Sequence, residues 1–456
     1  MQIKDMITKR IHQILKPEHD LRYEVICCLV FNILLILSVF AKPVALLCFV
    51  VSAGMLLFLR SDAIYRWLLF AFPCAVIFKM DPDSSSFFTY LEFLSLFLIV
   101  IRTRKISPLV VAGIALLVLE VLVGINSLGA VVDIVKLVAG LLLYYYFTEE
   151  YLRKDIVKYT SFFLAGMISS SILGMFKLNI PRLMDMYYGE VDYARIGGEQ
   201  ITRFQGIFND PNYFSIAAIL CVLICLLALL SRTYAGSKRN LYTWIGIAAG
   251  FVLFSLWGLS TISKSFFLLY VVTIVIAVLD LRKSSPLLRE LDMKKALIAA
   301  GIAVVAVVVI DPMGLISSVI GRLQASDLLT GRGKIWGMYW TAISQSAGVF
   351  LFGNGIDAGL LDQQSAHNMY LETVYYIGLI GCLLYAANIV LITWCKRRPF
   401  QHKISNYLGF AAVFATFMFL CGLNRTEYKY YLMIAFMIFN YNFQKQGRKL
   451  MPENKE

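Results

Sequence analysis

Residues 212–230 read NYFSIAAILCVLICLLALL, an apolar run without a charged side chain. About 20 apolar residues are the length of an α-helix that crosses the hydrocarbon core of a bilayer. Lipid offers backbone groups no hydrogen bonds, so such a run must be a helix or part of a closed barrel. Continuous rather than alternating hydrophobicity favours the helix. This stretch therefore predicts a transmembrane helix.

The same pattern recurs throughout the 456 residues, of which 59% are hydrophobic and 16% charged, with a mean hydropathy of +0.72. These values lie outside the range of soluble domains. We expect one all-α integral membrane domain over residues 1–456, with about 14 spans. The predicted spans are 24–40, 43–60, 64–80, 87–101, 108–125, 130–147, 156–177, 212–230, 241–259, 265–280, 296–311, 368–394, 405–421 and 430–443.

The net charge of +13 would suggest nucleic-acid binding in a soluble protein, but in a membrane protein the position of each cation matters more. With the N-terminus inside, Lys and Arg concentrate on inner segments, for example at Lys396, Arg397 and Arg398. The positive-inside rule then supports this orientation. We expect a multi-pass protein of a bacterial cytoplasmic membrane. Both termini are expected in the cytoplasm, and no nucleic-acid partner is expected.

Two predicted connections are long, residues 178–211 and 312–367, and both fall on the outer face. Long ordered connections in a compact domain are usually functional. The first ends in Arg203-Phe-Gln-Gly-Ile-Phe-Asn209-Asp210-Pro211-Asn212. Asn209 or Asp210 is expected to cap the next helix. Arg203 beside a helix N-terminus suits a phosphate group.

The second outer loop contains Gly331-Arg332-Gly333, followed by apolar residues at helical spacing from Lys334 to Ser346. This pattern predicts an interfacial helix whose N-terminus, with Arg332, offers a second anion site. His367 is the one histidine of the four that falls on an outer segment. Because its proton comes off near neutral pH, it is a candidate general base, although a structural hydrogen bond would also explain it.

Several ionisable residues fall within predicted spans, which makes each a functional hypothesis. Asp133 and Lys136 stand three residues apart, and we expect them to neutralise each other. Glu372 follows His367 by about one and a half helical turns, so it is expected near the same site without facing His367. Lys264 lies at the outer end of a hairpin, where a snorkelling anchor is the alternative. The others are Glu92 and Glu120.

Four motifs resemble, in order and spacing, the O-antigen ligase and O-antigen polymerase superfamily. They are Arg203 to Asn212, Gly331 to Trp336, Phe352-Gly-Asn-Gly355, and Ala366-His-Asn-Met-Tyr-Leu-Glu372 with Gly378 beyond. The resemblance covers about residues 200–380; the remaining spans match only in being hydrophobic. It implies a membrane glycosyltransferase with a GT-C-like fold that uses an undecaprenyl-pyrophosphate-linked glycan at the outer face.

In that family arginines hold the pyrophosphate and a histidine activates the acceptor hydroxyl, with inversion and without a metal or other cofactor. Carried over, Arg203 and Arg332 would bind the pyrophosphate and His367 would be the base. Two arginines can stabilise the charge of this leaving group without a metal ion. The expected supporting residues are Lys264, Asn212, Asn368, Tyr370 and Glu372. Where the family has Ser-Arg before a span, this chain has Ser263-Lys264, which keeps the charge but loses the bidentate fork.

The leading hypothesis is therefore a polysaccharide polymerase of O-antigen, capsule or exopolysaccharide assembly in the cell envelope. Its partners would be the lipid-linked oligosaccharide donor and acceptor, membrane lipids, and candidate flippase and chain-length-regulator proteins. The first alternative is a ligase that moves finished glycan to a lipid A core, a wall polymer or a protein. The second is a transporter or flippase of lipid-linked oligosaccharide, which should show repeat symmetry and broken or charged helices near the midplane.

Overall fold

The computed structural model describes residues 21–103, 105–122, 128–151, 156–187, 193–196, 199–235, 241–284, 314–324, 332–361, 365–396 and 428–439. The contacts divide the chain into two compact units. Unit 1 comprises Met1–Glu190, Leu329–Pro399 and Cys421–Tyr430, and unit 2 comprises Val191–Leu328, Phe400–Leu420 and Tyr431–Glu456. Arg203 therefore belongs to unit 2, and Arg332 and His367 belong to unit 1.

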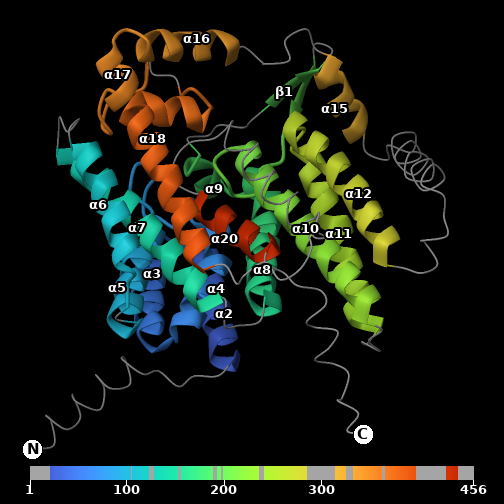
Figure 1. Cartoon of the computed structure of the whole chain (residues 1–456). Helices are drawn as coiled ribbons and strands as arrows, with labels where there is room; N and C mark the ends of the chain where they lie inside the picture. Colours follow the sequence, from blue (N-terminus) through green and yellow to red (C-terminus); the bar gives the residue numbers. More distant parts are fainter. Residues whose placement is uncertain are drawn as a thin grey trace, which may run out of the picture. The chain divides into compact units, whose positions relative to one another are not determined.

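Helices make up the regular structure that is described in unit 1 (Figure 1). Among them, α18 packs against α6, α7, α16 and α17, and α4 packs against α2 and α8. The elements are α2 (Leu21–Ser38), α3 (Lys42–Phe58), α4 (Ser61–Ala71), η1 (Phe72–Cys74), α5 (Phe87–Thr103), α6 (Pro108–Leu122), α7 (Leu128–Tyr151), α8 (Ile156–Met175), η2 (Lys177–Asn179), α9 (Pro181–Asp185), α16 (Arg332–Ile343), α17 (Ala347–Phe352), α18 (Met369–Lys396) and the first turn of α20 (Tyr428–Phe439).

Unit 2 is built on three helices that pack side by side, α10 (Pro211–Ala235), α11 (Leu241–Ser260) and α12 (Lys264–Ser284) (Figure 1). The middle of α10 is deeply buried, since every residue from Phe214 to Leu227 is at most 9% exposed. The shorter helix α15 (Leu315–Gln324) contacts α11, α12 and the first strand. The two strands are β1 (Tyr193–Ile196) and β2 (Glu199–Thr202).

The prediction of a helical membrane protein is confirmed. Every predicted apolar run on the described residues overlaps a helix, and the runs 296–311 and 405–421 lie outside them. Four of the described helices are long and apolar enough to cross a membrane, at Leu21–Ser38, Gly129–Thr148, Pro211–Leu229 and Met369–Thr393. Large apolar side chains such as Phe97 and Val390 (both 61% exposed) face outward from the helices. Such a surface is suited to lipid rather than to water.

The strands are an element that the all-α prediction missed. They pair antiparallel, with Tyr193 opposite Thr202 and Ile196 opposite Glu199. Gly197-Gly198 connects them, and a Gly-Gly pair between two short runs is a hairpin signal. The signal was present in the long connection 178–211, but four-residue strands are too short to stand out against the apolar runs around them.

The run 64–80 also differs from its prediction, because helix covers only part of it. α4 ends at Ala71, η1 ends at Cys74, and turns follow up to Ser86. Pro73 lacks a backbone N–H and its ring disfavours a continuous helix. The Ser86 hydroxyl then donates to the carbonyl of Ala75 (2.6 Å), which satisfies a backbone group beyond the helix end.

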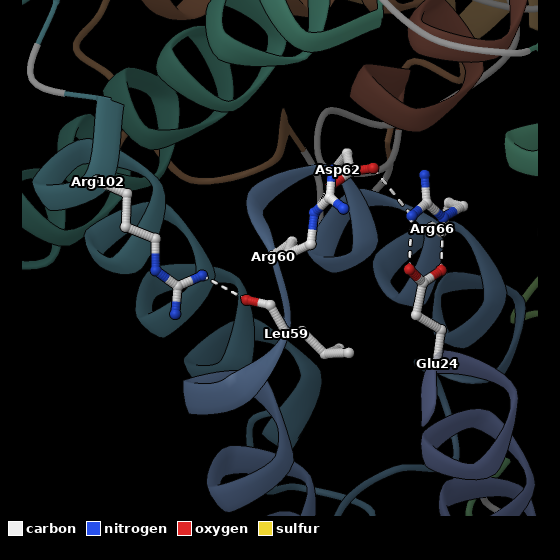
Figure 2. Close-up of polar contacts among 6 residues, drawn as sticks. All are labelled: Glu24, Leu59, Arg60, Asp62, Arg66 and Arg102. Carbon is white, nitrogen blue, oxygen red and sulfur yellow. Dashed lines mark hydrogen bonds and ion pairs between the residues drawn. The ribbon is translucent and has the colours of Figure 1, made fainter. Parts of the chain in front are cut away.

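A buried ionic cluster joins the first turns of α2 and α4 (Figure 2). The guanidinium of Arg66 donates to both carboxylate oxygens of Glu24 (2.7 Å each) and to Asp62 (3.0 Å). All three side chains are only 5% or 6% exposed. A buried cation of this kind is tolerated only because its partners are fixed by good geometry. Nearby, Arg102 of α5 donates to the carbonyls of Leu59 and Leu57, beyond and at the end of α3.

The charges that the sequence places within apolar runs have different surroundings. Asp133 and Lys136 form the predicted ion pair, at 3.1 Å, which confirms their mutual neutralisation. Glu92 pairs with Lys429 of α20 at 2.7 Å and accepts a hydrogen bond from the Tyr430 hydroxyl. The buried Glu120 of α6 lies against Gly381 of α18.

Helix α18 is broken at Gly378, whose φ of 65° and ψ of −179° are not helical. The break leaves the carbonyls of Tyr375 and Tyr376 available to other groups, and the backbone N–H groups of Asn354 and Gly355 donate to them (2.9 and 3.0 Å). Gly353 also has a positive φ, of 80°. A Cβ at Gly353 would overlap the Tyr376 carbonyl, and one at Gly378 would overlap the Leu351 carbonyl. Both positions therefore require glycine.

Candidate functional site

In unit 2, Arg203 lies where two helices begin. Its Nε donates to the carbonyl of Thr261 (2.9 Å), and its terminal nitrogen donates to Asn212 Oδ1 (3.4 Å). Asn212 is in the first turn of α10, and Thr261 is in the turn just before α12. Arg203 is 7% exposed, so its charge is held in a largely desolvated setting between the N-termini of α10 and α12.

Hydroxyl and amide groups link these two N-termini. Ser263 donates to Asn212 Oδ1 (3.2 Å), and Ser215 donates to Thr261 Oγ1 (2.9 Å). At α10, Asp210 Oδ1 accepts from the backbone N–H of Asn212 (2.6 Å), as predicted for a helix cap. Lys264 is the first residue of α12 and is half-buried. The structure thus gathers Arg203, Asn212 and the Ser263-Lys264 pair at one place in unit 2.

The segment that carries Arg203 is fixed by backbone and aromatic contacts. The backbone N–H of Phe204 donates to the carbonyl of Ser260 (2.9 Å), and the Phe204 ring packs edge-on against Phe214 (5.1 Å between ring centres). Ile262, which follows Thr261 in the turn that Arg203 contacts, is buried and has a φ of 50°, which a β-branched residue rarely adopts. Strain of this kind persists only where the surroundings over-determine the backbone, and it is often found at binding sites.

In unit 1, Arg332 is the first residue of α16 and is half-buried. One turn later, Trp336 Nε1 donates to the carbonyl of Ala366 (2.8 Å), the residue before His367. Side chains four apart share one helix face, so the start of α16 borders the histidine segment. α16 begins within Gly331-Arg332-Gly333, as predicted, and ends at Ile343, three residues before Ser346. Tyr339 and Ile343 form its buried face.

His367 occupies a tight turn before α18. Its φ of 47° is in the left-handed region, its side chain is half-buried, and its backbone N–H donates to Ser365 Oγ (3.1 Å). Asn368 caps α18, because its Oδ1 accepts from the backbone N–H groups of Tyr370 and Leu371 (3.1 and 3.2 Å). Glu372 is 1% exposed and accepts from the Ala366 N–H (2.8 Å) and the Ser365 hydroxyl.

Each predicted site residue can now be placed. His367, Asn368, Tyr370 and Glu372 lie on one continuous segment of unit 1, with Arg332 on the helix that contacts it. Tyr370 is 38% exposed. The carboxylate of Glu372 accepts a hydrogen bond from the backbone N–H of Ala366, in the turn before α18. Sequence reasoning missed Thr261, Ser365 and Trp336. Ser365 could have been found from its spacing to Glu372, but Trp336 and Thr261 act through long-range contacts that no local pattern encodes.

Tyr339 is the other titratable side chain close to this segment. It is fully buried and packs edge-on against Tyr375 (5.1 Å between ring centres). Burial, with a further contribution from the negative charge of Glu372, raises the pKa of Tyr339 to about 12. A phenol with this pKa keeps its proton at neutral pH. Among the described residues, no group of three or more His, Cys, Asp or Glu is placed to hold a metal ion.

Comparisons with known proteins give this chain no relative. No protein-family model matches the sequence, no curated protein matches it, and no solved structure matches its fold.

Proposed function

We propose that this protein is a membrane glycosyltransferase that polymerises a polysaccharide from undecaprenyl-pyrophosphate-linked repeat units. The observation that supports the proposal most is the unit 2 site, where Arg203 and Lys264 lie at the N-termini of α10 and α12. Helix N-termini and a guanidinium both favour a phosphate anion. A pyrophosphate on a lipid carrier is the anion that a membrane enzyme of this family resemblance would bind.

The proposed reaction divides the work between anion-binding residues and a base. His367 removes the proton from an acceptor sugar hydroxyl, and the resulting oxygen attacks the anomeric carbon of the donor. The bond between that carbon and the pyrophosphate oxygen breaks, with inversion, and the lipid pyrophosphate leaves. Arg203 and Arg332 stabilise the negative charge that develops on the leaving group.

The proposed membrane arrangement is a GT-C-like fold with about 14 spans in a bacterial cytoplasmic membrane. Both termini would lie in the cytoplasm, and the segments with Arg203, Arg332 and His367 would lie on the outer face. Reporter fusions at the C-terminus and within residues 312–330 measure this directly. A reporter active outside the cell at the C-terminus would contradict the arrangement.

The decisive experiment measures polymer formation by purified protein in nanodiscs supplied with a lipid-linked repeat unit. His367→Ala should abolish the polymer ladder while leaving expression and thermal unfolding unchanged, because the imidazole is half-buried rather than part of the core. His12→Ala serves as a matched control and should retain activity. Full activity of His367→Ala would remove His367 from the base role.

Ligation of finished glycan to a lipid A core, a wall polymer or a protein is the close alternative, since both reactions use the same donor chemistry. Deleting the gene and analysing the lipid-linked pool separates them. Accumulated single repeat units would identify a polymerase. Full-length polymer that remains on its lipid carrier would identify a ligase.

A transporter or flippase of lipid-linked oligosaccharide is favoured by one specific observation, the broken helix α18 with the buried Glu120 facing Gly381 on it. Broken helices and intramembrane charge are features of transporters. Here, however, the break at Gly378 is closed by backbone hydrogen bonds from Asn354 and Gly355. Transport of a lipid-linked sugar into vesicles without a new glycosidic bond would establish this alternative.

A further inference from the structure

The turn that carries His367 is hydrogen-bonded to a buried carboxylate, that of Glu372. Glu372 stands on the first turn of α18 and is 1% exposed. Its Oε1 accepts the backbone N–H of Ala366 at 2.8 Å and also accepts the hydroxyl of Ser365. Since an unpaired buried carboxylate would be costly, these bonds are an integral part of the turn.

Ser365 extends the link to His367 itself. Its Oγ donates to Glu372 and accepts the backbone N–H of His367 (3.1 Å), so the carboxylate, the hydroxyl and the histidine backbone form a chain. A hydroxyl can do both at once because it has one proton and two lone pairs. Donation to an ionised acceptor also strengthens the bond.

This chain of hydrogen bonds stabilises the left-handed backbone conformation of His367. His367 has a φ of 47°, which costs a non-glycine residue about 1–3 kcal/mol and persists only where its neighbours fix it. Trp336 and Asn368 fix the two ends of the turn, at the Ala366 carbonyl and at the first turn of α18. Glu372 and Ser365 fix its interior, where the left-handed residue lies.

We propose that Glu372, acting through Ser365, is a positioning residue that sets the orientation in which the His367 imidazole meets the acceptor hydroxyl. The proposal rests on the proposed glycosyltransferase function for its catalytic consequence. It does not place Glu372 in contact with substrate. Its role is to keep His367 in the left-handed turn, whereas Asn368 caps the helix and would do so without it.

The first measurement is independent of catalysis. Exchange of the histidine C2 hydrogen in heavy water, followed by mass spectrometry of the peptide that contains residue 367, reports the accessibility of that imidazole. Glu372→Ala should change the rate of exchange at His367 and leave the rates at His12 and His19 unchanged. Ser365→Ala should change the rate at His367 in the same direction by less, because the bond from Glu372 to Ala366 remains. Ser344→Ala, an exposed hydroxyl of the same outer segment, should have no effect.

The second measurement is polymer formation with varied donor concentration. Glu372→Ala should lower kcat about 100-fold, as a misplaced catalytic group does, while KM for the donor changes less than about 3-fold. Glu372→Gln keeps an acceptor oxygen for Ala366 and Ser365, so it should lose much less than Glu372→Ala. A Gln variant as impaired as the Ala variant would overturn the geometric role.

The two measurements separate the failure of this inference from failure of the proposed function. Unchanged His367 exchange in both Glu372→Ala and Ser365→Ala would overturn the inference, whatever the activity. If the wild-type protein forms no polymer but the exchange shifts as expected, the positioning role stands and the glycosyltransferase proposal falls. Because Ser365→Ala removes only one hydroxyl, it keeps the test valid where Glu372→Ala does not fold.

Discussion

Arg203 and Arg332 have the same proposed role but different surroundings. Arg203 is buried and bonded to Thr261 and Asn212, so it also ties the segment before α10 to the turn before α12. Arg332 is half-buried at the start of α16. A substitution at Arg203 therefore changes stability as well as binding.

Arg332→Lys should impair polymer formation nearly as much as Arg332→Ala. Lysine keeps the charge but loses the planar fork that holds two phosphate oxygens. A lost charge-assisted hydrogen bond corresponds to about 10- to 100-fold in KM for the donor. Equal activity of the Lys variant and the wild-type protein would show that simple charge attraction is sufficient.

The raised pKa of Tyr339 predicts that the stability of the protein decreases at alkaline pH. Burial raises its pKa from an ordinary value of 10 to about 12. The folded state thus holds this proton more tightly than the unfolded state, and the resulting stability is complete below pH 10 and decreases as the pH rises from 10 to 12. Thermal unfolding in detergent should show a steeper decline over this range for the wild-type protein than for Tyr339→Phe. The same decline in both would exclude Tyr339 as its cause.

At the scale of elements, the break in α18 tolerates fewer amino acids than the helices around it. Gly378→Ala should strongly destabilise the protein, because the positive φ costs about 1–3 kcal/mol and the new Cβ would also overlap the Leu351 carbonyl. Unfolding by heat in detergent measures the effect. Gly337→Ala is the matched control: it lies on α16 with nothing within 4 Å of its added Cβ and should be neutral or stabilising. Equal stability of the two variants would contradict this account of the break.

Helices and caps could be predicted from the sequence because their causes are local. The apolar run at 212–230 and the Asp210 cap follow from neighbouring residues. Three other features could not be predicted from the sequence: the break at Gly378, the ion pair of Glu92 with Lys429, and the hydrogen bond from Trp336 to Ala366. Each depends on a partner distant in the chain, and a single sequence does not record which distant residues meet.

The same limit applies to the candidate site. The sequence placed Arg203 beside the N-terminus of the helix at 212–230. The link of Arg203 to Thr261 and that of Asn212 to Ser263 depend on how α11 and α12 pack against α10. Glu372 was placed near His367 by helical geometry. Its bonds to Ser365 and Ala366 require the left-handed turn, which no residue in that stretch signals, since histidine there is compatible with many conformations.

At the scale of the whole molecule, the proposed chemistry uses arginines in place of a metal ion. Metal chelators should therefore leave polymer formation by the nanodisc-embedded protein unchanged. The measurement is turnover of lipid-linked repeat units with and without EDTA. Inhibition that is reversed by adding back a divalent cation would contradict the proposed division of roles between Arg203, Arg332 and His367.

The closed break in α18 has a consequence for how the chain enters the membrane during synthesis. The segment Gly353 to Gly355 leaves the ribosome before Tyr375 and Tyr376, whose carbonyls it satisfies. These carbonyls can therefore find their partners as soon as they reach the bilayer, and no unsatisfied backbone has to wait in lipid for a later segment. Residues 347–396 are thus suited to insertion as one unit, with the interruption already sealed when the helix enters the hydrocarbon.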